Sequence, residues 1–72
     1  MEESVYKVIT LIGSSPESWE KAAATAVEQA GKRLQDMRIA RIEEFDMHLA
    51  DGKVLVYRVR LRVSFKYHPK EE

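Results

Sequence analysis

The sequence predicts an α+β fold with the element order β-α-β-β, in which a three-stranded antiparallel sheet wraps on one helix. Two observations lead to this prediction. Residues 55–67 alternate between apolar and polar side chains almost without error, which is typical of a long strand with one dry face. Upstream, a single segment places its apolar residues at helical spacing and can cover that face. The 72 residues are expected to form one domain, 1–72.

Residues 4–12 are expected to form the first strand, and both faces of this strand are largely apolar. Ile9 and Leu11 fall on one face, whereas Val8 and Ile12 fall on the other. A strand that is apolar on both sides is usually buried on both sides. Because one helix covers only one face, the pattern predicts that another copy of the chain covers the second.

The helix is expected to run from about Pro16 to about Asp36, with Ser15 as its N-cap and Pro16 at its first position. Its apolar stripe consists of Trp19, Ala22, Ala23, Ala26, Val27, Ala30, Leu34 and Met37. Gly31 falls inside this range and is expected to cost about 1 kcal/mol relative to alanine. Trp19 has two interpretations, which are an anchor at the edge of the core and a ring that stacks on a ligand.

Residues 38–49 are expected to form the second strand, although neither of its alternating sets is consistently apolar. We therefore predict a bulge near Glu43–Phe45. Asp51 and Gly52 predict a hairpin turn, since both residues readily adopt positive φ. The third strand is the most apolar and is placed in the centre of the sheet, which gives the strand order 1-3-2.

The dry face of the third strand carries Tyr57, Phe65 and Tyr67, which we expect in the core. The chain is expected to end in a charged tail after His68 and Pro69, because proline cannot continue a strand ladder. His48 and His68 are isolated in the sequence, so neither is expected to bind a metal.

The composition excludes several classes of function. Twelve basic residues balance 12 acidic ones, so the overall positive charge of a nucleic-acid-binding protein is missing. There are no cysteines for disulfides or thiolate metal sites, and no apolar run approaches the ~20 residues of a membrane span. No nucleophile elbow, phosphate-binding glycine loop or histidine pair is present, so no enzymatic activity is predicted. A cytoplasmic protein is expected.

Charged residues on the second and third strands are the candidates for function. Arg58, Arg60 and Arg62 form a ladder on one face of the third strand. They can pair with carboxylates across the sheet, or their guanidinium groups can bind the phosphate of a small ligand. The carboxylates are Glu43, Glu44 and Asp46, and these are either arginine partners or ligands of a hard cation. One chain holds too few of them for six or more ligand oxygens, but a symmetry axis would multiply the set.

Several segments of the sequence resemble the dodecin family. They are Val5-Tyr6-Lys7-Val8-Ile9, the helix start Gly13-Ser14-Ser15-Pro16-Glu17-Ser18-Trp19 with Ala22-Ala23, the Asp51-Gly52 turn, and Val59-Arg60-Leu61-Arg62-Val63-Ser64-Phe65. The resemblance covers nearly the whole chain. It implies a non-enzymatic protein whose β-α-β-β subunits assemble as a homododecameric hollow shell. The partner of each subunit is then another copy of the chain, with neither nucleic acid nor membrane.

Many dodecins bind flavins, such as FMN or riboflavin, between subunits. The family's flavin-stacking tryptophan and its hydrogen-bonding glutamine match Ile39 and Arg58 in this sequence. Isoleucine has no aromatic ring and arginine has no acceptor for the flavin N–H groups, so both positions depart from the flavin-binding pattern.

The helix start and the run Arg38–Ile42 are more similar to a dodecin branch described as calcium-binding. The carboxylates that hold metal in some dodecins match Glu17 and Glu44. Coenzyme A is also associated with the family, but no motif here tests it. The resemblance thus implies binding or storage of a small ligand or cation, with calcium as first candidate and flavin as second. The remaining alternative is a purely structural assembly.

Overall fold

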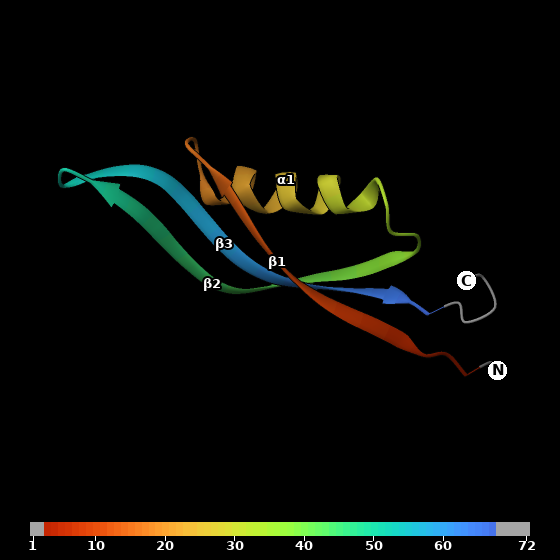
Figure 1. The fold of residues 1–72 in the computed structure, drawn as a ribbon. Coiled ribbons are helices and arrows are strands. Elements are labelled where there is room, and N and C mark those ends of the chain that lie inside the picture. Colours follow the sequence, from red (N-terminus) through yellow and green to blue (C-terminus); the bar gives the residue numbers. More distant parts are fainter. Residues whose placement is uncertain (1–2, 68–72) are drawn as a thin grey trace.

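The computed structural model describes residues 3–67 and confirms the predicted order of elements (Figure 1). Strand β1 spans Tyr6–Ser15, helix α1 spans Trp19–Gly31, strand β2 spans Met37–Ala50 and strand β3 spans Lys53–Lys66. The strands form one antiparallel sheet in the predicted order β1-β3-β2. The charged tail expected after His68 and Pro69 lies outside the described residues.

The core lies between α1 and the middle of the sheet. Its buried apolar side chains are Ala22, Val59, Leu61 and Val63. A Cβ added at Gly13 would overlap the backbone oxygen of Ala22 and would lie 2.9 Å from the Cβ of Ala26. The helix therefore approaches β1 as closely as two backbones allow, which is what its alanine-rich stripe predicts.

Both ends of the helix differ from the prediction. Ser18, not Ser15, is the N-cap, because its Oγ accepts the backbone N–H of Lys21 at 3.0 Å. Ser15 is instead the buried last residue of β1, and its Oγ accepts the backbone N–H of Glu17 at 3.0 Å.

At the other end, the helix stops at Gly31 rather than near Asp36. Gly31 is thus the last helical residue and not an interior one. Leu34 and Met37 lie beyond the helix, and Asp36 adopts a left-handed φ of 58° where the chain leads into β2. The apolar spacing continued past the true helix end because Met37 still packs against the core from β2.

A bulge interrupts β2 where the sequence predicted one. Ile42 pairs with Leu61 and Glu44 pairs with Arg60, which leaves Glu43 as an extra residue between them. The bulge explains the irregular alternation of this strand, because it turns Glu43 and Glu44 to the same face. Further shifts in register occur between Met37 and Ile39 and between His48 and Leu49. The predicted turn at Asp51 and Gly52 is confirmed, with φ values of 54° and 74°.

The molecule is elongated, with extents of 53 × 20 × 16 Å. Its radius of gyration is 14.9 Å, whereas a compact chain of this length has about 11 Å. The cause is that the helix is much shorter than the two long strands. The 13 residues of α1 span about 20 Å, but the 14 residues of β2 and of β3 each span about 46 Å. The helix therefore covers less than half of the sheet.

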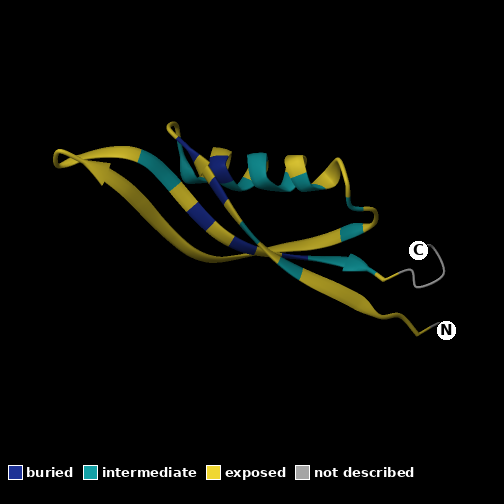
Figure 2. Cartoon of the chain, viewed as in Figure 1, coloured by how far each residue is buried: buried dark blue, intermediate teal, exposed yellow. Residues whose placement is uncertain are grey.

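Apolar side chains outside this cover remain exposed (Figure 2). Tyr6, Val8 and Ile12 on the outer face of β1 are 46%, 55% and 55% exposed, as expected for a face that the helix cannot reach. The expectation that Tyr57, Phe65 and Tyr67 lie in the core was wrong. Tyr57 and Phe65 are only half-buried and Tyr67 is exposed, because they flank the short covered stretch rather than lie within it.

Candidate functional site

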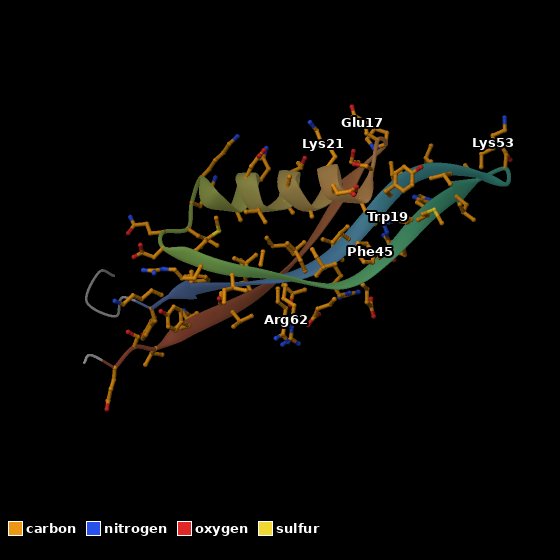
Figure 3. The ribbon with its side chains drawn as sticks, turned by 180° about the vertical axis from the view of Figure 1, so that it is seen from behind. Glu17, Trp19, Lys21, Phe45, Lys53 and Arg62 are labelled. Carbon is orange, nitrogen blue, oxygen red and sulfur yellow. The ribbon has the colours of Figure 1, made fainter. Side chains whose placement is uncertain are left out.

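The sheet face away from α1 carries a charged ladder, which we call the arginine face. Arg58, Arg60 and Arg62 project from β3 on this side, and the labelled Arg62 points away from the helix in Figure 3. Each arginine pairs with a carboxylate of β2. The Nε–oxygen distances are 2.8 Å for Arg58–Asp46, 3.1 Å for Arg60–Glu44 and 2.8 Å for Arg62–Glu43. This arrangement confirms the cross-strand pairing interpretation of the arginine ladder.

Asp46 makes a two-point pair with Arg58. Two guanidinium nitrogens of Arg58 donate to its two carboxylate oxygens, at 2.8 and 2.9 Å. These hydrogen bonds and the positive charge of Arg58 lower the pKa of the Asp46 carboxyl group. The backbone oxygen of Asp46 accepts the indole N–H of Trp19 at 3.0 Å. Asp46 therefore connects the arginine face to the first turn of α1.

A shallow hollow of about 270 Å³ lies on the arginine face toward the other end of β2. Its lining residues are Val8, Ile39, Arg41, Arg62 and Ser64. Arg41 lies directly opposite Arg62 in the β2–β3 register, which brings two positive charges together. An apolar floor beside the guanidinium group of Arg41 suits a small anionic ligand with an apolar part, whereas Arg62 already pairs with Glu43. Sequence reasoning singled out Ile39 and Arg62 here but missed Val8, Arg41 and Ser64, whose proximity depends on the strand register.

The two positions that match the family's flavin-binding residues are not brought together within one chain. Ile39 pairs with Ser64 on the arginine face and is 66% exposed. Arg58 pairs with Asp46. Ser64 and Arg58 lie on the same strand, separated by about 20 Å at ~3.3 Å per residue. The side chain of Arg58 is also occupied by its two-point contact with Asp46.

The two candidate metal ligands also lie apart. Glu17 is exposed in the connection between β1 and α1, on the helix side of the sheet (Figure 3). Glu44 lies on the opposite side, where it pairs with Arg60. Among residues 3–67, no group of three or more histidine, aspartate or glutamate side chains is arranged to hold a metal ion. One described chain therefore does not bring these two carboxylates together around a cation.

Trp19 packs at the edge of the core, which favours its interpretation as an anchor. Its ring makes edge-to-face contacts with Phe45 and Tyr57, with centroid distances of 5.6 and 5.0 Å. A second hollow of about 300 Å³ adjoins it between α1 and β2. The residues that line this hollow are Trp19, Glu20, Ala23, Ile42 and Phe45.

Comparison with known proteins identifies the family. The sequence model of the dodecin family matches residues 5–68 of this chain. The chain belongs to the dodecin family. A Mycobacterium tuberculosis protein named calcium dodecin is 50% identical over 68 residues, which are 94% of this chain and 96% of that protein.

Solved dodecin structures agree with the fold. The crystal structure of the calcium-chelating Mycobacterium tuberculosis dodecin, which has a novel calcium-binding site, matches with a TM-score of 0.84 and 49% identity. That match covers 96% of this chain and 99% of that chain. A Thermus thermophilus dodecin mutant matches with a TM-score of 0.86 and 30% identity, over 92% and 98% of the two chains. Dodecin from Streptomyces davaonensis has a TM-score of 0.88 at 24% identity, over 93% and 98%, which shows the shared fold.

No helix in the described part of the chain is long and apolar enough to cross a membrane.

Proposed function

We propose that this dodecin binds calcium, assembles as a homododecameric hollow shell and serves to bind or store a cation or small ligand without catalysing a reaction. The observation that carries the proposal is the 50% identity to calcium dodecin over nearly the full length of both chains. The open shape of the subunit supports assembly, because four apolar side chains alone are fully buried among the described residues.

Glu17 and Glu44 are the proposed calcium ligands. Both are exposed, and carboxylate oxygens suit Ca²⁺, which takes six to eight oxygen ligands. The two carboxylates lie on opposite sides of the sheet, so each would contribute to a separate site or to a site shared between copies. At Glu44 the cation would compete with Arg60, whose Nε lies 3.1 Å from Glu44 Oε1.

Titration calorimetry with calcium, on protein first treated with a chelator, tests this proposal. Wild-type protein is expected to release or absorb heat on binding, and Glu17→Gln or Glu44→Gln is expected to weaken binding on the order of tenfold or more, because each removes a charged ligand. Glu28→Gln, which alters an exposed helix residue, is the matched control and should bind like wild type. Equal binding by all three variants would remove Glu17 and Glu44 from the proposal, and no binding by wild type would contradict calcium binding itself.

A flavin is the second candidate ligand, and the hollow at Ile39 supports it. The hollow is large enough for part of a ring system and has two arginines at its edge. Two observations argue against flavin binding. Ile39 has no aromatic ring to stack on the flavin, and the side chain of Arg58 is held by Asp46. Strong quenching of riboflavin fluorescence by the purified protein would favour flavin over calcium as the ligand.

Native mass spectrometry of freshly purified protein tests the assembly and any retained ligand together. We expect a twelve-subunit species. A twelve-subunit species that binds neither calcium nor flavin, and that dissociates in high salt, would instead support the purely structural alternative. Sensitivity to salt is the expected sign of that alternative because salt screens exposed ion pairs between subunits.

A further inference from the structure

Arg60 lies in the middle of the arginine ladder and has two carboxylates of β2 within reach. It lies directly opposite Glu44 in the β2–β3 register, and its neighbour Arg58 lies opposite Asp46 in the same way. Because Glu44 and Asp46 alternate regularly along β2, both face the same side of the sheet as Arg60. Diagonal neighbours on two antiparallel strands lie about 7–8 Å apart, which a long side chain spans. Arg60 can therefore reach Asp46 as well as Glu44 without a movement of the backbone.

The contact between Arg60 and Glu44 is the easiest contact of the ladder to break. Its Nε–oxygen distance of 3.1 Å is the longest of the three, since the other two are 2.8 Å. Glu44 is also the most accessible of the three carboxylates, because its side chain is 66% exposed, against 51% for Asp46 and 29% for Glu43. An exposed ion pair of this kind adds little to stability. A competing cation therefore displaces Arg60 from Glu44 at small cost.

Asp46 can accept Arg60 and still keep Arg58. A carboxylate has about four lone-pair sites for hydrogen bonds. Arg58 uses two of them, with donor–acceptor distances of 2.8 and 2.9 Å. After the hydrogen bonds and the charge of Arg58, the charge of Arg60 is a further cause of the lowered pKa of Asp46, so Arg60 already acts on this carboxylate. A second anionic partner is thus available to Arg60 when it leaves Glu44.

We propose that Arg60 moves from Glu44 to Asp46 when calcium binds Glu44, and that this exchange determines the affinity of the cation site. The inference rests on the proposed role of Glu44 as a calcium ligand. Arg60 Nε lies 3.1 Å from Glu44 Oε1, so a cation binds this oxygen only after the guanidinium group has moved away. The loss of this contact weakens calcium binding, and the new contact with Asp46 offsets part of the loss. Arg60 is then a positioning residue of the site and not a ligand.

Removal of the competing guanidinium group tests the effect on affinity. Titration calorimetry with calcium compares Arg60→Gln with wild type at one ionic strength, after treatment with a chelator. Arg60→Gln is expected to bind calcium about twofold to fivefold more tightly, which corresponds to the loss of one exposed ion pair. Arg41→Gln is the matched control, because it removes the same charge from the same face, opposite Arg62, and is expected to change the affinity less than twofold. Glu44→Gln added to Arg60→Gln should abolish the gain.

The outcomes of the titration separate the inference from the proposed function. Equal binding by wild type and Arg60→Gln overturns only the inference, as does an equal gain in Arg41→Gln or a gain that survives Glu44→Gln. Binding by Arg60→Gln alone contradicts calcium binding by wild type and supports the competition by Arg60. Binding by neither protein overturns both.

The destination of Arg60 is tested without a substitution, which also serves if Arg60→Gln fails to fold. Crystal structures of the wild-type protein with and without calcium are compared. With calcium at Glu44, the guanidinium group of Arg60 is expected within hydrogen-bonding distance of the Asp46 carboxylate. Calcium at Glu44 with Arg60 still on the same carboxylate, or turned toward solvent, overturns only the inference. Saturating calcium that leaves Glu44 without a cation removes Glu44 from the proposed function and overturns the inference with it.

Discussion

The middle and the end of β3 differ in burial although their sequences are alike. Val59, Leu61 and Val63 under α1 are at most 1% exposed. Val54 and Leu55, which lie on the same strand near the β2–β3 turn, are 44% and 52% exposed. The difference is the reach of the helix and not the character of the side chains. Alternation along a strand thus shows which face is apolar, whereas the length of the covering element decides how much of that face one chain buries.

The largest expected effect comes from the covered region. Leu61→Ala leaves a cavity in the core and is expected to lower the free energy of unfolding by about 2–5 kcal/mol. Val54→Ala, near the β2–β3 turn, is expected to lower the free energy of unfolding by less than about 1 kcal/mol once the contribution of assembly is removed. Urea denaturation at several protein concentrations measures both, because the contribution of assembly varies with concentration. If Leu61→Ala and Val54→Ala lowered the free energy of unfolding of the single chain equally, the difference in burial between the two parts of β3 would not decide stability.

A smaller effect is expected where the helix approaches β1. A side chain at Gly13 would meet the backbone of Ala22, which cannot move without the whole helix, so Gly13→Ala is expected to lower the free energy of unfolding by about 1–3 kcal/mol. Gly31→Ala is the control. There the nearest atom is the flexible Cε of Met37, at 3.1 Å from the added Cβ. Thermal unfolding followed by circular dichroism should show a loss for the first variant and little change for the second.

The smallest effect is expected at Asp46, which joins the covered region to the arginine face. Because Arg58 lowers the pKa of Asp46 in the folded chain, the pair stabilises the fold above the unfolded value near 3.8. That stabilisation is lost as the pH falls below this value toward the lower folded pKa. Asp46→Asn should therefore be slightly less stable than wild type at pH 7, and the difference should shrink in acid and in high salt.

Urea midpoints at pH 7 and near pH 3, in low and high salt, check the expectation for Asp46. A difference between Asp46→Asn and wild type that stays the same at both pH values would show that the charge of Asp46 is not its cause.

Most of the fold was predictable because local patterns agree with one another. The clean alternation of residues 55–67, the apolar helix stripe and the turn at Asp51 and Gly52 together defined the element order and the central strand. The irregular alternation around Glu43 also predicted the bulge. The helix ends were not predictable in the same way. Ser15 and Ser18 are both suitable caps, and the choice between them depends on how far β1 continues.

The candidate site was predictable in its residue types but not in its geometry. Arginines and carboxylates at alternate positions indicated cross-strand pairs, and the structure brings them together. The hollow beside Ile39 depends on the register of three strands, which sequence patterns do not specify to one residue. Glu17 and Glu44 were identified only through the family resemblance, and the geometry of one described chain does not bring them together.

The bulges in β2 have a consequence for how copies of this chain can meet. β2 is an edge strand, and a new strand can extend a sheet only where the edge presents evenly spaced hydrogen-bonding groups. The extra residue Glu43 and the shift after Met37 break that spacing, and charged side chains such as Arg38 and Arg41 follow the same edge. This edge is therefore protected against fibril growth, and a chain with so much exposed apolar surface can associate through its faces without adding strands there.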